Sequence, residues 1–444
     1  MSRRFLITLW PFTGHLLPQM SIAMALRERG HEVAFFSGEA VRATVEGEGF
    51  EFFPFQRLDQ ERAFRSMRAV DTGDRRSRPG GGRLLPILRD WLVETIADQL
   101  SDLRAVLARW RPDVIATDLS LWGPILVLWE AERIPVALSS TFMGPLIPGP
   151  DAPAFGFGLR PPGTPRSRMA ARALTRLTEL AATPMRRRVD EIRAANGLPP
   201  LGDSVNRFTG RLPLYIVGNI RELDYNRHDL PPSVHYVGNC IWYPERAGGV
   251  EWLDAIRPDR PWVHVTESTL AYGDPFLLRT AIEAAADQPF ELIVTTGDQR
   301  APEALRLGTL PANVHVTAWL SHGELLPRCS AVVNVGGKAT ILAAMEAGVP
   351  MVLVPTTWDK PDNAIRVIES GAGVRLAPRD CTPETLREAV GEVLSERRYR
   401  AAAKRLAARL ADSPGPAGAA DLLEALAADQ AARPLAAAVD GGGA

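Results

Sequence analysis

The sequence contains few cysteines and no long apolar run, and both shortages narrow the class of protein. Its three cysteines, Cys240, Cys329 and Cys381, are far apart, so we expect neither a disulfide framework nor a zinc site. No stretch reaches about 18 uncharged apolar residues, and we therefore expect no transmembrane helix. The apolar run at 5–12 is short and ends in a polar segment, unlike a secretory signal peptide. These features favour a protein of the reducing cytoplasm.

The chain also lacks an excess of charge of either sign. The chain has 51 Lys and Arg against 52 Asp and Glu, a formal net charge of −1, so no bulk field attracts nucleic acid or an anionic membrane. Arginines gather at 62–89 and 160–193, and we expect both stretches to be solvated faces, the first including a flexible loop at 75–82. For the chain as a whole, peripheral membrane contact or contact with a second copy of the chain is a weak possibility.

The length and the hydrophobic pattern indicate two α/β domains. A chain of 444 residues with 46% hydrophobic residues is too long for one core and can bury two. Short apolar runs alternate with longer amphipathic ones, which predicts parallel βαβ units in doubly wound sheets. Strands are expected at 5–9, 32–37, 114–117, 214–217, 262–266, 291–295, 314–317, 331–334 and 351–354, and in a run ending at Leu138. Helices are expected at 18–29, 275–285 and 340–346.

Composition also suggests where the domains divide. Residues 239–260 are rich in proline, glycine and charge, so we assign residues 1–238 to a first domain and 239–260 to a linker. Residues 261–412 then form the second domain. A helical tail at 413–444 follows the break at Ser413-Pro414-Gly415-Pro416, and its last residues, 440–444, are expected to fray.

The most informative segment is a glycine turn in the second half. Val332 to Val335 reads as a strand, Gly336-Gly337 as a tight turn and the residues from Thr340 as a helix. A turn of this kind presents backbone N–H groups at the positive end of a helix dipole, which suits a phosphate or diphosphate. A buried strand and the loop Trp358-Asp359-Lys360 follow in order, and this ordered series is stronger evidence than the two glycines alone.

A histidine follows the first predicted strand. His15 lies after Gly14 and shortly before Pro18, which suits the first turn of a helix. Histidine can remove a proton from a hydroxyl near neutral pH, and a carboxylate that orients it improves the base. Asp118, at the end of the predicted strand 114–117, would reach the same sheet edge. The alternative is that His15 only caps a helix and Asp118 is a turn residue.

Together these segments resemble the GT-B glycosyltransferases, and the resemblance covers nearly the whole chain. It implies two Rossmann-like domains that face a cleft, with the acceptor held by the first half and a nucleotide sugar by the second. Inverting members carry Gly-His-x-x-Pro after the first strand and an Asp at the position of Asp118. The resemblance therefore implies that His15 is the general base and that Asp118 is its partner.

The resemblance also implies a set of donor contacts. An aromatic residue at the position of Trp319 stacks on the nucleobase in this family, and hydroxyls at the end of the first strand of the second half touch phosphate. The implied donor-binding residues are Ser268, Thr269, Trp319, Gly336, Gly337, Lys338, Thr340, Asp359, Lys360 and Asn363. Ser268 and Thr269 could equally end the strand, and Trp319 could be a core residue.

Several positions depart from the family pattern. The family has a histidine just before Gly-Gly or two places before it, where this chain has Val335 and Asn334; Lys338 could replace its charge or point to solvent. A ribose-binding glutamate is replaced by Ala343, which tilts the expected donor from UDP-sugars towards dTDP-sugars. Lys360 replaces the glutamine of an Asp-Gln pair that holds sugar hydroxyls, and would suit a carboxylated or unusual sugar.

We therefore predict an inverting glycosyltransferase. It would move a sugar from a dTDP- or UDP-sugar to a hydroxyl of a small, largely apolar natural product or lipid, with no metal and no cofactor beyond the donor. The alternative is a repurposed or auxiliary protein of the same architecture that transfers no sugar. A related sugar-nucleotide epimerase would need acid and base groups near the nucleotide that the sequence does not offer.

Overall fold

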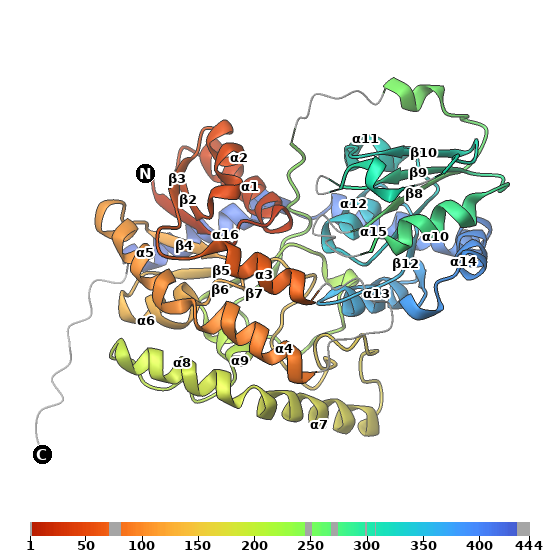
Figure 1. Ribbon diagram of the computed structural model, residues 1–444. Coiled ribbons are helices and arrows are strands. Elements are labelled where there is room, and N and C mark those ends of the chain that lie inside the picture. The colour runs from red at the N-terminus through yellow and green to blue at the C-terminus, as the bar shows by residue number, and fades with distance from the viewer. Residues whose placement is uncertain are drawn as a thin grey trace, which may run out of the picture.

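The computed structural model describes residues 2–70, 81–244, 251–267, 274–297, 300–306 and 308–432. They form two halves, each built on a parallel sheet with helices on both faces (Figure 1). This confirms the predicted α/β class with two doubly wound parallel sheets. Within the described residues, no helix is long and apolar enough to span a membrane.

The first sheet has seven strands in the order β3-β2-β1-β4-β5-β6-β7, and every neighbouring pair is parallel. The strands are β1 (Arg4–Thr8), β2 (Glu32–Ser37), β3 (Glu51–Pro54), β4 (Val114–Thr117), β5 (Val136–Ser140), β6 (Leu214–Val217) and β7 (Val234–Tyr236). The helices of this half are α1 (Thr13–Glu28), α2 (Arg42–Gly47), α3 (Gln60–Val70), α4 (Gly81–Leu88), α5 (Ile96–Arg109), α6 (Trp129–Ala131), α7 (Pro165–Ala181), α8 (Thr183–Ala195) and α9 (Val205–Phe208).

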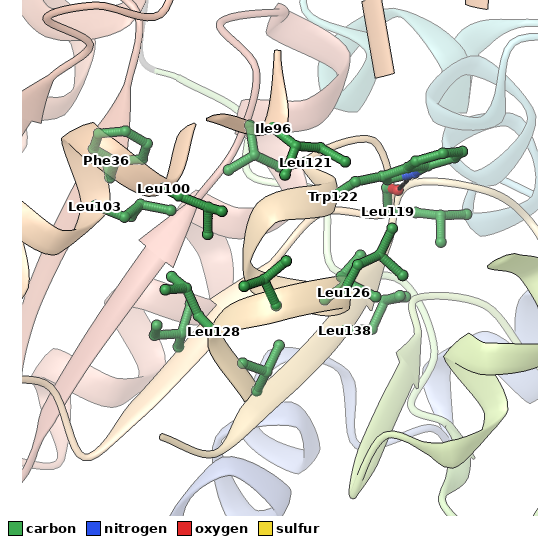
Figure 2. Packing of buried hydrophobic residues seen from close by; sticks show 14 of the residues in the cluster. Phe36, Ile96, Leu100, Leu103, Leu119, Leu121, Trp122, Leu126, Leu128 and Leu138 are labelled. Atoms are coloured by element: carbon green, nitrogen blue, oxygen red, sulfur yellow. Dashed lines mark hydrogen bonds between the residues drawn. The ribbon is translucent and has the colours of Figure 1, made fainter. Parts of the chain in front are cut away.

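Both faces of the first sheet are buried, as expected for a parallel sheet covered by helices. Leu6 of β1 packs into the core on one face, whereas Phe5 and Ile7 pack into the core on the other. Figure 2 shows part of the first core, a cluster that includes Leu100 of α5, Leu138 of β5 and Leu119 and Leu121, which follow β4. The central strands of the sheet are therefore fixed from both sides.

The second sheet has six parallel strands in the order β10-β9-β8-β11-β12-β13. They are β8 (Trp262–Thr266), β9 (Glu291–Thr295), β10 (Val314–Thr317), β11 (Ala331–Asn334), β12 (Met351–Leu353) and β13 (Gly373–Arg375). The helices are α10 (Phe276–Ala285), α11 (His322–Leu325), α12 (Lys338–Glu346), α13 (Lys360–Glu369), α14 (Pro383–Ser395) and α15 (Arg397–Ala411). The consecutive residues Val332 and Val333 of β11 enter the cores on its two faces.

The last helix returns to the first half. Helix α16 (Gly415–Ala432) contacts α1, and Leu423 shares a core with Phe5 and Ile7 of β1. At its start the N–H of Gly415 donates to the carbonyl of Val237. The predicted tail at 413–444 thus covers the first sheet over its described part, while 440–444 lie outside the described residues. The division into domains around 239–260 stays a prediction.

Some predicted element boundaries were wrong. Helix α1 begins at Thr13 rather than at Pro18, so His15 lies inside its first turn and Pro18 lies in the helix interior. The first turn is closed by the N–H groups of His15 and Leu16, which both donate to the carbonyl of Phe12. Gly81 and its neighbour, expected in a loop, begin α4; residues 71–80 of that stretch lie outside the described residues.

Candidate active site

His15 and Asp118 form the pair that the sequence predicted. His15 Nδ1 lies 2.7 Å from Asp118 Oδ2, although the residues are 103 positions apart. Parallel pairing of β1 with β4 places the ends of these strands side by side, and both residues follow directly from that edge. The other ring nitrogen, Nε2, has no hydrogen-bond partner among the described residues, and the side chain is 21% exposed. Nε2 can therefore accept a proton from a group that enters the site.

Asp118 is fully buried and held on all sides. Oδ2 also accepts from the N–H of Trp10, and Oδ1 accepts from the N–H and the hydroxyl of Ser120 at 2.6 and 2.5 Å. Burial alone would raise the pKa of this carboxyl, but the charge of His15 and these hydrogen bonds outweigh burial and lower it. Asp118 therefore stays ionised and can stabilise an imidazolium.

The Gly336-Gly337 turn connects β11 to α12 as predicted. Gly336 has φ +90°, and a Cβ there would lie 2.8 Å from the carbonyl oxygen of Lys360, so only glycine fits. The side chain of Asn334 closes the turn, because its Oδ1 accepts from the N–H of Gly336 at 2.7 Å. That N–H is thus occupied, and the N–H groups of the first turn of α12 are the ones available to an anion.

Lys338, the first residue of α12, points across to the first half. Its Nζ donates to the carbonyl of Ser140, the last residue of β5, at 3.0 Å. Burial lowers the pKa of Lys338 to about 8, although Cys240 and Asp359 nearby raise it. The sequence left two roles open for Lys338, phosphate contact and a solvent-facing side chain. The structure adds a third, a hydrogen bond between the two halves.

The loop after β12 brings three predicted donor residues together. Asn363 Nδ2 donates to Asp359 Oδ2 at 2.8 Å and to the carbonyl of Gly336 at 3.0 Å. Burial raises the pKa of Asp359, against the hydrogen bond from Asn363, which lowers it. Lys360 Nζ donates to the hydroxyl of Thr356 at 3.1 Å. These contacts fasten the start of α13 to the glycine turn.

A chain of aromatic rings links this loop to the histidine. Trp358 has φ +62° and its ring meets Trp91 edge-on, with centroids 6.0 Å apart. Trp91 contacts Phe12 in the same way, and Phe12 contacts His15 with centroids 5.2 Å apart. Together with the Lys338 contact, these rings connect the loop after β12 to the His15–Asp118 pair.

The remaining predicted donor residues differ in exposure. Thr340 is a partly exposed residue of the first turn of α12, and Trp319 is partly exposed between β10 and α11. Ala343 is buried in the core of the second half, so its position offers no acceptor to a ribose. Ser268 and Thr269 lie outside the described residues.

Several residues that support the site were not predicted from the sequence. Ser120 was overlooked although Asp-x-Ser after a strand is a common local hydrogen-bonding pattern. Asp362 and Arg366 of α13 make buried contacts with the first half, and Glu267 and Arg300 form a buried ion pair at 2.9 Å beyond β8 and β9. These partners come from distant segments, so no local pattern indicates them.

The sequence of this chain is similar to those of known proteins. Residues 279–426 match the family described as erythromycin biosynthesis protein CIII-like, C-terminal domain. The chain is 34% identical to 4'-demethylrebeccamycin synthase of Lentzea aerocolonigenes over 96% of this chain and all of that protein. It is 30% identical to demethyllactenocin mycarosyltransferase of Streptomyces fradiae over 94% of this chain and 85% of that protein.

The chain belongs to the natural-product glycosyltransferases. A solved structure of spinosyn rhamnosyltransferase complexed with thymidine diphosphate has the same fold, with a TM-score of 0.70 and 21% identity over 95% of this chain and all of that one. This glycosyltransferase therefore has the GT-B architecture that the sequence predicted. The alternative of a protein that transfers no sugar is not favoured by these relatives.

Proposed function

We propose that this glycosyltransferase inverts the anomeric centre of a dTDP-sugar and transfers the sugar to a hydroxyl of a small, largely apolar acceptor. The observation that carries the proposal is the placement of His15 and Asp118 opposite the Gly336-Gly337 turn, with Lys338 reaching from that turn to the end of β5. This arrangement offers a base and a diphosphate site on the two sides of one reaction centre.

On the acceptor side, His15 Nε2 takes the proton of the acceptor hydroxyl. Its Nδ1 is bound to Asp118, which fixes the tautomer and stabilises the imidazolium that forms. The acceptor oxygen attacks the anomeric carbon while the bond to the diphosphate breaks on the opposite face, so the configuration inverts. A base of this kind contributes about 10²- to 10⁴-fold to the rate.

On the donor side, the first turn of α12 and Lys338 stabilise the negative charge of the departing diphosphate. Lys338 would exchange the carbonyl of Ser140 for phosphate oxygens when the donor binds. The carboxylate of Asp359 and the ammonium of Lys360 lie at the start of α13 and would hold the sugar hydroxyls. Trp319 would stack on the base and gain about 1–3 kcal/mol.

The preference for dTDP rests on Ala343. A buried alanine accepts no hydrogen bond from a ribose 2′-hydroxyl, so a ribose gains nothing over a deoxyribose at this position. The thymidine diphosphate complex of a protein with the same fold supports the same nucleotide class.

Calorimetry with dTDP and UDP tests the donor class. We expect dTDP to bind at least as tightly as UDP, and a UDP preference of more than tenfold, about 1.4 kcal/mol, would show that another group holds the ribose. His15→Ala tests the base. We expect transfer to be abolished and dTDP affinity to be retained, whereas turnover equal to that of the parent would reject the general-base role.

A further inference from the structure

The helix that carries the sugar contacts is also attached to the first half of the chain. Helix α13 begins directly after Asp359 and lies along the boundary between the two halves (Figure 1). Two of its charged side chains, Asp362 and Arg366, are buried at 2% and 8% exposure. Neither takes part in the mechanism described above, so their burial needs another explanation.

Asp362 grips the loop that follows β5. Its Oδ2 accepts from the N–H of Gly156 at 2.6 Å, and its Oδ1 accepts from the N–H of Gly158 at 2.7 Å. Both glycines have positive φ, and a Cβ on Gly158 would lie 2.8 Å from Cβ of Pro361. Two backbone amides of the loop therefore bind the carboxylate of Asp362, and glycine allows the loop to approach α13 this closely.

Arg366 provides the second attachment. Its Nε donates to Asp224 Oδ1 at 2.7 Å, in an ion pair whose side chains are 8% and 1% exposed. The guanidinium lies over the ring of Tyr225 at 4.1 Å, and the hydroxyl of Tyr236 donates to the other oxygen of Asp224. Removing one partner would leave a buried charge without compensation, so the contact is strongly held.

The loop and the helix come from the two halves that are proposed to hold the acceptor and the donor. The loop, residues 141–164, starts from the carboxyl end of β5, next to the end of β4 where Asp118 follows. The helix starts at the residues proposed to hold the donor sugar, and Asn363 ties it to the glycine turn. A misplacement of about 1 Å between reacting groups can cost roughly 100-fold in rate.

We propose that Asp362 is a positioning residue, supported by the Arg366–Asp224 pair. It fixes the position of the acceptor-side loop 141–164 relative to the donor helix α13. The inference rests on the proposed function, because the second half must hold a nucleotide sugar. Donor binding at the glycine turn then restrains α13 through Asn363, and α13 restrains the loop through Asp362.

Hydrogen exchange with and without dTDP tests the proposal. In the parent protein, we expect saturating dTDP to slow amide exchange in peptides that cover 149–160. In Asp362→Asn we expect dTDP to bind with an affinity within about threefold of the parent, while the protection of the loop is lost. Both proteins share the loop sequence, so their intrinsic exchange rates are the same. A merely structural role would loosen the loop equally with and without nucleotide.

Two further variants make the test sharper. Glu369→Gln is the matched control, because Glu369 ends the same helix and pairs with Arg160 across the same boundary at 3.3 Å, but both side chains are exposed. It should behave as the parent does. Gly158→Ala breaks the contact from the loop side and leaves the helix intact. It should lose the dTDP-dependent protection of the loop, and it replaces Asp362→Asn as the test if that variant does not fold.

The outcomes separate this inference from the proposed function. If neither dTDP nor UDP binds the parent, the nucleotide-sugar function is rejected. If dTDP binds but does not protect the loop, or protects it equally in the parent and in Asp362→Asn, the positioning role is rejected. Loss of dTDP affinity in Asp362→Asn would also reject it, because the residue would then belong to the nucleotide site.

Discussion

Asp118→Asn is the substitution that tests the proposed catalytic pair most directly. An amide has nearly the shape of the carboxylate but loses its charge and turns one oxygen into a donor. At the Oδ2 position, the new NH₂ group would face the donors of His15 and Trp10. At the Oδ1 position it would face the N–H and the hydroxyl of Ser120, and that hydroxyl can rotate to accept. We therefore expect the amide oxygen to keep facing His15.

The loss of charge sets the size of the effect. A carboxylate in hydrogen-bond contact stabilises a neighbouring cation by about 1.4–4 kcal/mol. The imidazolium forms only as the proton is transferred, so Asp118→Asn should lower kcat by about 10- to 1,000-fold. Affinity for dTDP should not change, because Asp118 lies in the first half, at the end of β4.

A double-mutant cycle is the assay that separates a pair from two independent residues. We expect the variant that combines His15→Ala with Asp118→Asn to be no slower than His15→Ala alone, since the carboxylate acts through the ring. Additive losses, or a kcat for Asp118→Asn within about threefold of the parent, would refute the assignment.

Three other predictions concern the donor half. Lys338→Met should weaken dTDP by about tenfold but thymidine little, and more at low salt than at high salt; in the parent, dTDP affinity should fall as pH rises above about 8, because the ammonium then loses its proton. The phosphate role would be rejected if Lys338→Met bound dTDP as tightly as the parent does across that pH range and at both salt concentrations. Lys360→Met should change which dTDP-sugar is accepted and leave dTDP affinity unaltered, which a panel of donors can measure. Gly336→Ala should cost about 1–3 kcal/mol of unfolding free energy, because its Cβ meets the backbone of Lys360, whereas Gly337→Ala, with nothing within 4 Å of the added carbon, should cost less than about 1 kcal/mol. Equal melting temperatures of the two alanine variants would contradict that account of the turn.

The central strands could be predicted from the sequence because their pattern is local. Strands β2, β4, β6, β8, β9 and β11 have the bounds that their apolar runs predicted, since central strands of a parallel sheet are buried on both faces, and the edge strand β10 also has its predicted bounds. The other edge strands, β3, β7 and β13, were not predicted. Two of them have only three residues, and edge strands gain too little burial to require a clear apolar run.

The chemistry of the site was also partly local. Gly336-Gly337 before a helix and His15 after the first strand are readable because the turn and the strand end place those groups at a sheet edge without help from distant residues. The pairing of His15 with Asp118 was suggested by two strand ends at one sheet edge and by the resemblance to inverting GT-B enzymes, and the structure gives it a distance of 2.7 Å.

Only the tertiary structure decided how the two halves meet. The direction of Lys338 towards Ser140, the return of α16 to the first sheet, and the grip of Asp362 on Gly156 and Gly158 each join segments separated by many residues. A charged residue on a helix reads as solvated in the sequence, because the partner that would compensate its burial is not nearby in the chain. The sequence by itself therefore determined the two sheets and the groups at their edges, and the packing between the halves determined which of those groups face one another.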